Sequence, residues 1–405
     1  MHSSDRLHAL DAVRAFALLS GIALHAAQPF IAGLPWVANE SPNNALAAIW
    51  YTIHMFRMPL FFLIAGFFGR MLLEQRGVPA FIKDRSRRIL VPLVVGLPIV
   101  MLVTGLAYVL GTLAAGADPH SLRGPQPLAS PGHHGLLASV NLIHLWFLYY
   151  LAMFYAAALI LRSAFNTVLG AHGRLYRAVD ALIKFLMRGP WGPLLLAAPI
   201  AAYYCQLKDW SIWGGLPAPM SLIPDTGALI AYGLFFGFGW LLQRQQVLLV
   251  ALSKHWALYG ALALAMWAVC RMIGGSTPHW GSFLEPGELV VYTTSYVVGG
   301  WFWSFALIGF ALRHLEGYST VRRYLADSSY WLYLMHIPAL IFFEGLLHPL
   351  PWPASVKYLL AIAGAVPVLL LSYHYLVRFT FIGATLNGRR QRRVSTDLSR
   401  LATVG

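Results

Sequence analysis

The chain has 405 residues, of which 58% are hydrophobic and only 11% are charged, and its mean hydropathy is +0.63. Soluble domains carry about 25% charged residues, so this composition excludes an ordinary soluble protein. It predicts an all-α, polytopic integral membrane protein with about ten transmembrane helices.

Apolar stretches long enough to cross a hydrocarbon core of about 30 Å recur along the whole chain. We expect spans at residues 7–33, 45–73, 88–116, 136–162, 191–206, 225–243, 254–273, 289–313, 329–347 and 356–378, of which the fifth is short. These spans form one transmembrane domain over residues 1–380, and a basic cytoplasmic tail follows over 381–405. We expect the first span to be retained, because it keeps its charges and lacks a small-residue cleavage site.

Basic residues are concentrated in alternate loops between the predicted spans. On one side lie Arg70, Arg76, Lys83, Arg85, Arg87, Arg88, Arg162, Arg174, Arg177, Lys184, Arg188, Arg244, Lys254, Arg313, Arg322, Arg323, Arg378, Arg389, Arg390, Arg392, Arg393 and Arg400. The opposite loops hold or border only Arg123, Lys208, Arg271 and Lys357. This asymmetry predicts that both termini are cytoplasmic. It also accounts for the net charge of +14, so we infer no nucleic-acid partner.

The first span carries a cation and a titratable base. His25 follows Arg14 by eleven positions, which places both side chains on one helix face, about 16 Å apart along the axis. Charged residues in a spanning helix usually face a bundle interior or an aqueous cavity, which indicates a functional site. The alternative is an Arg that reaches the interface and a His that bonds to a neighbouring helix. We expect Asp11, one turn before Arg14, to pair with its guanidinium.

Further polar residues lie in the second span and just beyond it. His54 and Arg57 fall within IHMFRMPLFFLIAGFF, and Arg85, Arg87 and Arg88 form a compact cationic group before the third span. Guanidinium groups so close together can hold phosphates, although clusters of this kind also arise from the positive-inside distribution alone.

The later spans add other candidates. His144 and Trp146 begin the fourth span, where they form either part of a site or an interfacial aromatic belt. Glu285 and Glu288 lie at the outer edge of the eighth span, and His336 lies inside the ninth, followed by a helix-bending Pro338.

Two segments depart from the pattern of spans and short loops. In residues 174–188 the apolar side chains fall on one helix face and the basic side chains fall largely elsewhere. This pattern predicts a helix that lies on the cytoplasmic leaflet. The outer loop 117–135 contains several His residues, but their spacing matches no ligand pattern, so we expect no metal site. Cys205 and Cys270 both lie near outer ends of spans, and the sequence leaves open whether they pair.

The motifs together resemble the membrane-bound acyltransferase-3 family. They are Arg14 to His25, FRMPLFFLIAGFF, RSRR at 85–88, HLWFLYYL at 144–151 and SSYWLYLMHIP at 328–338, and the resemblance covers about residues 7–378. The variants IHMFRMPLFF, LIHLWFL and YLMHIP most resemble members that succinylate osmoregulated periplasmic glucans. One departure is Ala65, where the family usually has Ser.

The resemblance implies a bacterial inner-membrane, multi-pass O-acyltransferase that moves an acyl group from cytoplasmic acyl-CoA to a hydroxyl of a periplasmic polysaccharide. It implies acyl-CoA, with succinyl-CoA favoured, as co-substrate and no tightly bound cofactor. The catalytic residues would be His25, as the general base, and Arg14, which would neutralise donor charge or polarise the thioester region. Arg85, Arg87, Arg88 and Arg57 would bind the donor, while His54, His144, Trp146, Glu285, Glu288 and His336 would line the site or bind the acceptor.

Two alternatives remain open at this point. Within the same class, the enzyme transfers acetyl to another surface polysaccharide. In a different class, the chain is a polytopic sugar or lipid transporter, although it shows no internal repeat and no paired broken helices.

Overall fold

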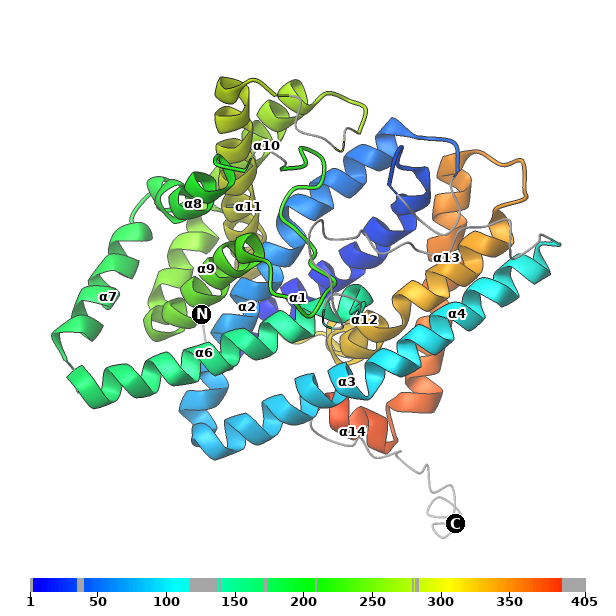
Figure 1. The fold of residues 1–405 in the computed structure, drawn as a ribbon. Helices are drawn as coiled ribbons and strands as arrows, with labels where there is room; N and C mark the ends of the chain where they lie inside the picture. The colour runs from blue at the N-terminus through cyan, green and yellow to red at the C-terminus, as the bar shows by residue number, and fades with distance from the viewer. Residues whose placement is uncertain are drawn as a thin grey trace, which may run out of the picture.

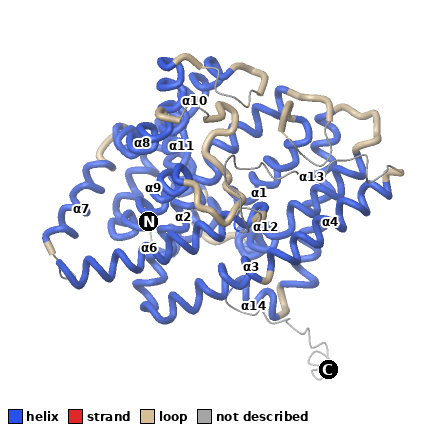
Figure 2. Tube along the Cα trace, viewed as in Figure 1, coloured by secondary structure: helices blue, strands red, loops and turns tan. Residues whose placement is uncertain are grey.

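The computed structural model describes residues 3–34, 40–116, 137, 140–169, 173–207, 210–278, 280 and 284–387. Within these ranges every regular element is helical and no strand is present, which confirms the predicted all-α class (Figure 2). The longer helices are α1 (Ser3–Ala27), α2 (Asn44–Arg85), α4 (Gly96–Ala114), α6 (Trp146–Leu169), α9 (Thr226–Leu242), α10 (Leu249–Gly274), α11 (Pro286–His314), α12 (Thr320–Leu347) and α13 (Ala354–Ser372). The shorter α-helices are α3 (Val91–Val94), α7 (Arg174–Leu186), α8 (Trp191–Tyr204) and α14 (Phe381–Asn387).

Short 3₁₀ and π segments connect several of these helices. They are η1 (Gln28–Phe30), η2 (Ser86–Leu90), η3 (Ile143–Leu145), η4 (Gln243–Leu248) and η5 (Tyr373–Val377). The π-helical segments are η2 and η5. Isolated π turns are uncommon and often accompany functional sites, which draws attention to η2, since it contains Arg87 and Arg88.

Seven described helical segments are long and apolar enough to cross a membrane. Two of them, Asn44–Ala114 with 71 residues and Thr226–Gly274 with 49, each exceed the length of two crossings of about 20 residues. In the first, Gly77 interrupts the helix with a φ of 73°, a conformation that glycine adopts without steric cost. The structure therefore supports a multi-pass bundle, and the count of about ten and the cytoplasmic termini stay predictions. The short fifth span corresponds to α8, with 14 residues.

Helix α1 lies near the middle of the bundle, with α6 to α9 on one side and α4 and α13 on the other (Figure 1). It packs against α2, α11 and α12. The α2–α9 contact depends on two glycines: a Cβ on Gly66 would lie 2.0 Å from the Phe236 carbonyl oxygen, and one on Gly239 would lie 1.9 Å from that of Leu63. This close backbone approach is typical of membrane helices that pack through small residues.

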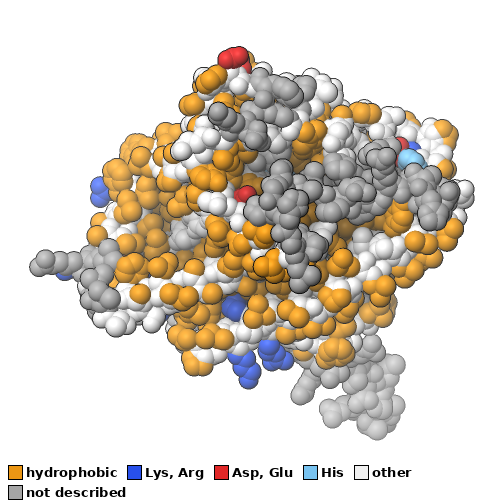
Figure 3. All heavy atoms as spheres, in the orientation of Figure 1, with side chains coloured by type: hydrophobic (Ala, Val, Ile, Leu, Met, Phe, Trp, Pro, Cys, Tyr) orange, Lys and Arg blue, Asp and Glu red, His pale blue; other side chains and the backbone are white. Residues whose placement is uncertain are grey.

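The outer surface of the bundle is largely apolar. Leu102 on α4 is 73% exposed, and Leu359 on α13 is 61% exposed. Figure 3 shows hydrophobic side chains spread over the face in view, with Lys and Arg mainly along its lower edge. Such a large exposed apolar surface fits contact with lipid rather than water.

The predicted amphipathic segment forms α7, which lies outside the candidate spans. Its Asp180 accepts hydrogen bonds from Nε and Nη2 of Arg244 at 2.8 and 2.9 Å. These bonds hold the pKa of Asp180 below its ordinary value, although partial burial opposes the shift. Cys205 and Cys270 are both free thiols. The predicted outer loop 117–135 lies outside the described residues. Of the predicted tail 381–405, residues 381–387 form α14, and the rest lies outside the described residues.

Candidate functional site

A large cavity of about 1540 Å³ runs through the bundle. We name three parts of its lining. The basic end comprises Asp11, Arg14, Arg76, Asp84, Arg85, Arg88, Arg323 and Asp327; the histidine centre comprises His25, Arg57, His144 and His336; the aromatic end comprises Trp50, His54, Tyr203, Tyr204, Trp210, Asp225 and Trp280.

The order of residues along α1 and α2 places these parts in sequence through the bundle. On α1, Arg14 precedes His25 by about 16 Å of helix rise, and both line the cavity, as their spacing predicts. Helix α2 presents Trp50 and Arg57 near its start and Arg85 at its end. The cavity lining thus extends from the basic end past the histidine centre to the aromatic end.

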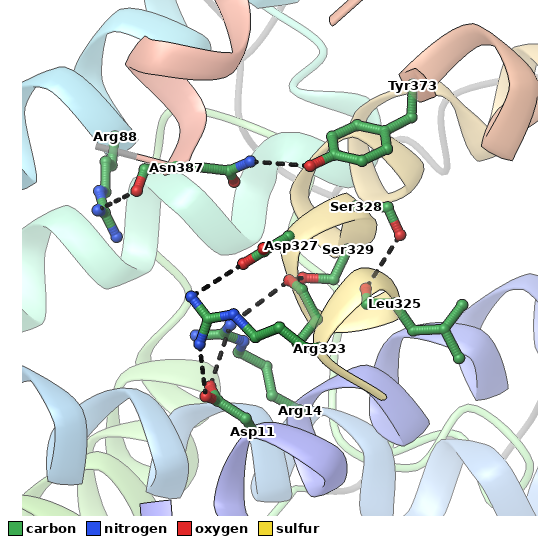
Figure 4. A network of polar contacts seen from close by, with 11 residues as sticks. Asp11, Arg14, Arg88, Arg323, Leu325, Asp327, Ser328, Ser329, Tyr373 and Asn387 are labelled. Carbon is green, nitrogen blue, oxygen red and sulfur yellow. Dashed lines mark hydrogen bonds and ion pairs between the residues drawn. The ribbon is translucent and has the colours of Figure 1, made fainter. Parts of the chain in front are cut away.

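The basic end is held by a network of ion pairs between α1 and α12 (Figure 4). Arg14 lies 3.2 Å from Asp11, as expected, and also donates to the Ala326 carbonyl at 3.5 Å. Arg323 contacts both Asp11, at 3.7 Å, and Asp327, at 3.2 Å. Arg14 therefore belongs to a paired network about three helical turns from His25, rather than lying beside it.

The cationic group near residue 85 divides into two faces. Arg85 and Arg88 line the cavity and share Asp84, at 3.0 and 3.3 Å respectively. Arg88 also donates to the Asn387 carbonyl at 2.6 Å. Arg87 is exposed and does not line the cavity, because two residues along a helix turn its side chain about 200° away from Arg85. We expected all three to bind the donor, but the structure brings only Arg85 and Arg88 to the cavity.

Three histidine rings lie in a row at the histidine centre. The centroids of His25 and His336 are 5.1 Å apart, and those of His336 and His144 are 5.0 Å apart. Nδ1 of His25 lies 2.6 Å from Oε1 of Gln28, and Nδ1 of His336 lies 2.7 Å from the Tyr333 carbonyl. Since a carbonyl oxygen only accepts, each Nδ1 carries the proton, which leaves Nε2 as the proton-accepting nitrogen in the neutral ring.

The cation at the histidine centre is Arg57 rather than Arg14. The guanidinium of Arg57 interacts electrostatically with His25, His144 and His336. It packs against Gly21 of α1, where an added Cβ would lie only 2.6 Å from Nη1. Gly21 is one helical turn before His25, so the guanidinium lies about 6 Å from the level of His25 along the axis. Arg57 was predicted as a donor contact, and its proximity to the histidines required the tertiary structure.

The backbone before His144 adopts an uncommon conformation. Ile143 has a φ of +49°, a region that β-branched residues rarely occupy. Its N–H donates to Oδ1 of Asn141 at 2.8 Å, and the Tyr333 hydroxyl donates to the His144 carbonyl at 2.7 Å. These contacts hold the strained turn and place His144 against α12, a pattern that is frequent at functional sites.

The aromatic end contains aromatic rings, Tyr hydroxyls and one carboxylate but, among the described residues, no Lys or Arg. His54 stacks on Trp50 with centroids 4.8 Å apart, and its Nδ1 lies 3.0 Å from the Tyr296 hydroxyl. The Trp280 indole donates to the Ala32 carbonyl at 2.7 Å. Trp146 lines the wall between this end and the histidine centre, where it packs on Tyr232.

The structure places Glu285 and Glu288 outside the cavity. Both are exposed and form a capping box at the first turn of α11, in which each side chain accepts a backbone N–H. We expected them to line the site. The carboxylate that lines the aromatic end is instead Asp225, which caps α9 by accepting from Ala228 N–H at 2.7 Å.

A family profile described as an acyltransferase domain matches residues 7–374. The chain belongs to the acyltransferase-3 family. Glucans biosynthesis protein C of Escherichia coli (strain K12 / DH10B) is 22% identical over 396 residues, and the protein of the same name from strain SMS-3-5 is 21% identical over 391 residues. Each alignment covers 95% of this chain and 95% of the relative. No solved structure matches.

One departure from the family motifs lies in the cavity wall. Ala65, where the family usually has Ser, lines the wall and accepts a hydrogen bond from the Tyr155 hydroxyl at 2.9 Å through its carbonyl. That backbone contact does not need a side-chain hydroxyl.

Among the described residues, no group of His, Cys, Asp or Glu is suited to holding a metal, so the three histidines are not arranged as ligands.

Sequence reasoning missed several residues for which a signal existed. Gln28 lies three residues after His25, a spacing that brings side chains together on one helix face. Asp225 directly precedes an apolar helix, as a helix cap does, and Glu285-Pro-Gly-Glu288 has the spacing of a capping box. Gly21 offered no such signal, because its importance depends on Arg57 from another helix.

Proposed function

We propose that this acyltransferase-3 protein transfers a succinyl group from cytoplasmic succinyl-CoA to hydroxyls of a periplasmic glucan in the bacterial inner membrane. The observation that carries the proposal is that one cavity is lined by a basic end, by His25 and by an aromatic end. Distant similarity to glucans biosynthesis protein C over 95% of the chain supports the choice of donor and acceptor.

The basic end suits the nucleotide part of acyl-CoA. Five Arg and three Asp line it, so its net charge is positive. Guanidinium groups bind phosphate oxygens through paired, charge-assisted hydrogen bonds, and Arg85 and Arg88 already point into the cavity. The acyl arm then extends over the 16 Å of helix rise from Arg14 to His25. The cytoplasmic location of this end follows from the predicted topology.

In this proposal His25 acts as the general base. Its Nδ1–H donates to Gln28, which fixes the tautomer and directs Nε2 as the acceptor. As the sugar hydroxyl oxygen bonds to the thioester carbon, its proton passes to Nε2 of His25. The carbon–sulfur bond then breaks, and His25 returns the proton to the CoA thiolate. His336, whose ring lies 5.1 Å away, is the neighbouring base.

The aromatic end suits a neutral carbohydrate acceptor. Sugar rings stack on aromatic faces while their hydroxyls bond to amides, hydroxyls and carboxylates. Trp50, Tyr203 and Trp280 offer ring surface, and Asp225 offers an acceptor for sugar hydroxyls.

The test is transfer from labelled succinyl-CoA to purified glucan by the protein reconstituted in liposomes. Mass spectrometry of the glucan should show succinyl ester that depends on protein and donor. Acetyl-CoA is assayed in parallel, since preferential acetyl transfer would favour the O-acetyltransferase alternative. Movement of glucan or lipid without any transfer from CoA would contradict the proposal and indicate a transporter.

A further inference from the structure

We infer that Arg57 binds the distal carboxylate of the donor acyl group and so selects a dicarboxylic acyl-CoA over acetyl-CoA. This inference rests on the proposed function and assigns its donor specificity to one side chain. The first observation is the pairing of the cavity cations. Of the other five Arg in the cavity lining, Arg14, Arg85, Arg88 and Arg323 each lie within 3.3 Å of an Asp carboxylate, and Arg76 is exposed rather than buried.

Arg57 has no such partner among the described residues. The carboxylates that line the cavity are Asp11, Asp84, Asp225 and Asp327; the three at the basic end contact other Arg residues, and Asp225 caps α9. Nε of Arg57 is buried without a hydrogen-bond partner, and the side chain lines the cavity. A guanidinium buried in a membrane bundle is costly unless an anion accompanies it, so a bound anion would stabilise this arrangement.

The position of Arg57 fits the far end of a short dicarboxylic acyl group. Its Nη1 packs on Gly21, one helical turn or about 6 Å from the level of His25. The reacting carbonyl carbon must lie near His25, where the base can reach the attacking hydroxyl. Two methylene groups separate that carbon from the distal carboxylate of a succinyl group, a distance of the same order. An acetyl group would leave the guanidinium unpaired.

Gly21 makes this placement possible. Any side chain there would meet the guanidinium, because even a Cβ would lie 2.6 Å from Nη1. Gly21→Ala should therefore displace Arg57 while keeping its charge. Gly237→Ala is the matched control, since Gly237 also lies within a helix and has nothing within 4 Å of an added Cβ.

The experiment compares kcat/KM for succinyl-CoA and acetyl-CoA, using reconstituted wild type, Arg57→Gln, Arg57→Lys, Gly21→Ala and Gly237→Ala at matched amounts of folded protein. The wild type should prefer succinyl-CoA. Arg57→Gln should lower the succinyl-to-acetyl ratio by about ten-fold or more, mainly through the KM for succinyl-CoA, because a charge-assisted contact is lost. Arg57→Lys should have an intermediate effect, Gly21→Ala should lower the ratio, and Gly237→Ala should match the wild type.

Loss of both activities in equal proportion would overturn the inference and would instead favour a role for Arg57 at the reacting carbonyl. A wild type that uses only acetyl-CoA would overturn it as well. If Arg57→Gln does not fold, an unchanged ratio in Gly21→Ala still overturns the inference. Absence of transfer from either donor by the wild type would overturn the proposed function itself, an outcome distinct from these.

Discussion

The two ends of the cavity differ in how their polar groups are paired. At the basic end, Arg14 and Arg323 converge on Asp11, and Arg85 and Arg88 converge on Asp84. At the aromatic end, the described lining has one carboxylate, Asp225, and its remaining polar side-chain groups are Tyr hydroxyls and the ring nitrogens of Trp and His. The basic end thus retains a net positive charge in a fixed geometry, whereas the aromatic end offers neutral contacts and ring faces.

This difference indicates two ligands of different chemistry that meet at the histidine centre. Charge-assisted contacts suit phosphates, and ring stacking with neutral hydrogen bonds suits sugars. Each end should therefore control the apparent affinity for one substrate, while the centre should control the rate. Substitutions at the two ends and at the centre test this division.

The largest effect is expected for the accessibility of the two sides of the protein to a labelling reagent added outside the cell. In a protein with Cys205→Ala and Cys270→Ala, the exposed positions Gly287 and Arg87 are each replaced by Cys. In intact cells, a membrane-impermeant maleimide should label Gly287→Cys and not Arg87→Cys, because the charge distribution places residue 87 in the cytoplasm. Labelling of Arg87→Cys from outside would reverse the assignment of the two ends.

The next largest effect is on the rate. His25→Ala should lower kcat by about 10²–10⁴, the usual range for one positioned proton-transfer group, with little change in either KM. His314→Ala is the matched control, since His314 lies at the exposed end of α11, outside the cavity. Near wild-type turnover by folded His25→Ala would remove this residue from the mechanism and make His336 the next candidate.

At the basic end, Arg85→Gln together with Arg88→Gln should raise the KM for acyl-CoA by about ten-fold or more and leave the acceptor KM nearly unchanged. Arg87→Gln should change neither, because Arg87 is exposed and outside the cavity. This pair of results separates phosphate binding from a general effect of positive charge. Equal effects of all three substitutions would indicate that the cluster only sets orientation.

At the aromatic end, Trp280→Ala should raise the acceptor KM by about two- to ten-fold, the range expected for one aromatic contact, while the donor KM stays the same. Trp352→Ala serves as control, because Trp352 is exposed and does not line the cavity. A change in the donor KM alone would indicate that Trp280 contacts the donor rather than the acceptor.

The smallest effect distinguishes two kinds of carboxylate. Asp225→Asn keeps the helix cap, since Asn caps as well as Asp, but removes the charge; it should raise the acceptor KM by a few-fold. Glu288→Gln should leave both KM values unchanged, because Glu288 is exposed and occupied in the capping box of α11. A larger effect of Glu288→Gln on the acceptor KM would return that residue to the site.

Local sequence patterns determined the structural class of this protein and the helix face of α1 that lines its site. Composition and apolar runs predicted a helical membrane protein, because lipid requires every backbone polar group to bond within its own segment. The spacing of Arg14 and His25 placed both on one face of α1, because a helix repeats every 3.6 residues. The same periodicity, applied to Arg85, Arg87 and Arg88, would also have separated Arg87 from its neighbours.

Only the tertiary structure decided which groups surround His25. His336 comes from α12, His144 from a strained turn before α6, and Arg57 from α2. No spacing along the chain encodes these contacts, because they depend on helix pairing through positions such as Gly66 and Gly21, where small side chains let another helix or side chain approach. Helical periodicity fixes which residues share a face, whereas the packing of one face against another fixes which cation lies beside the base.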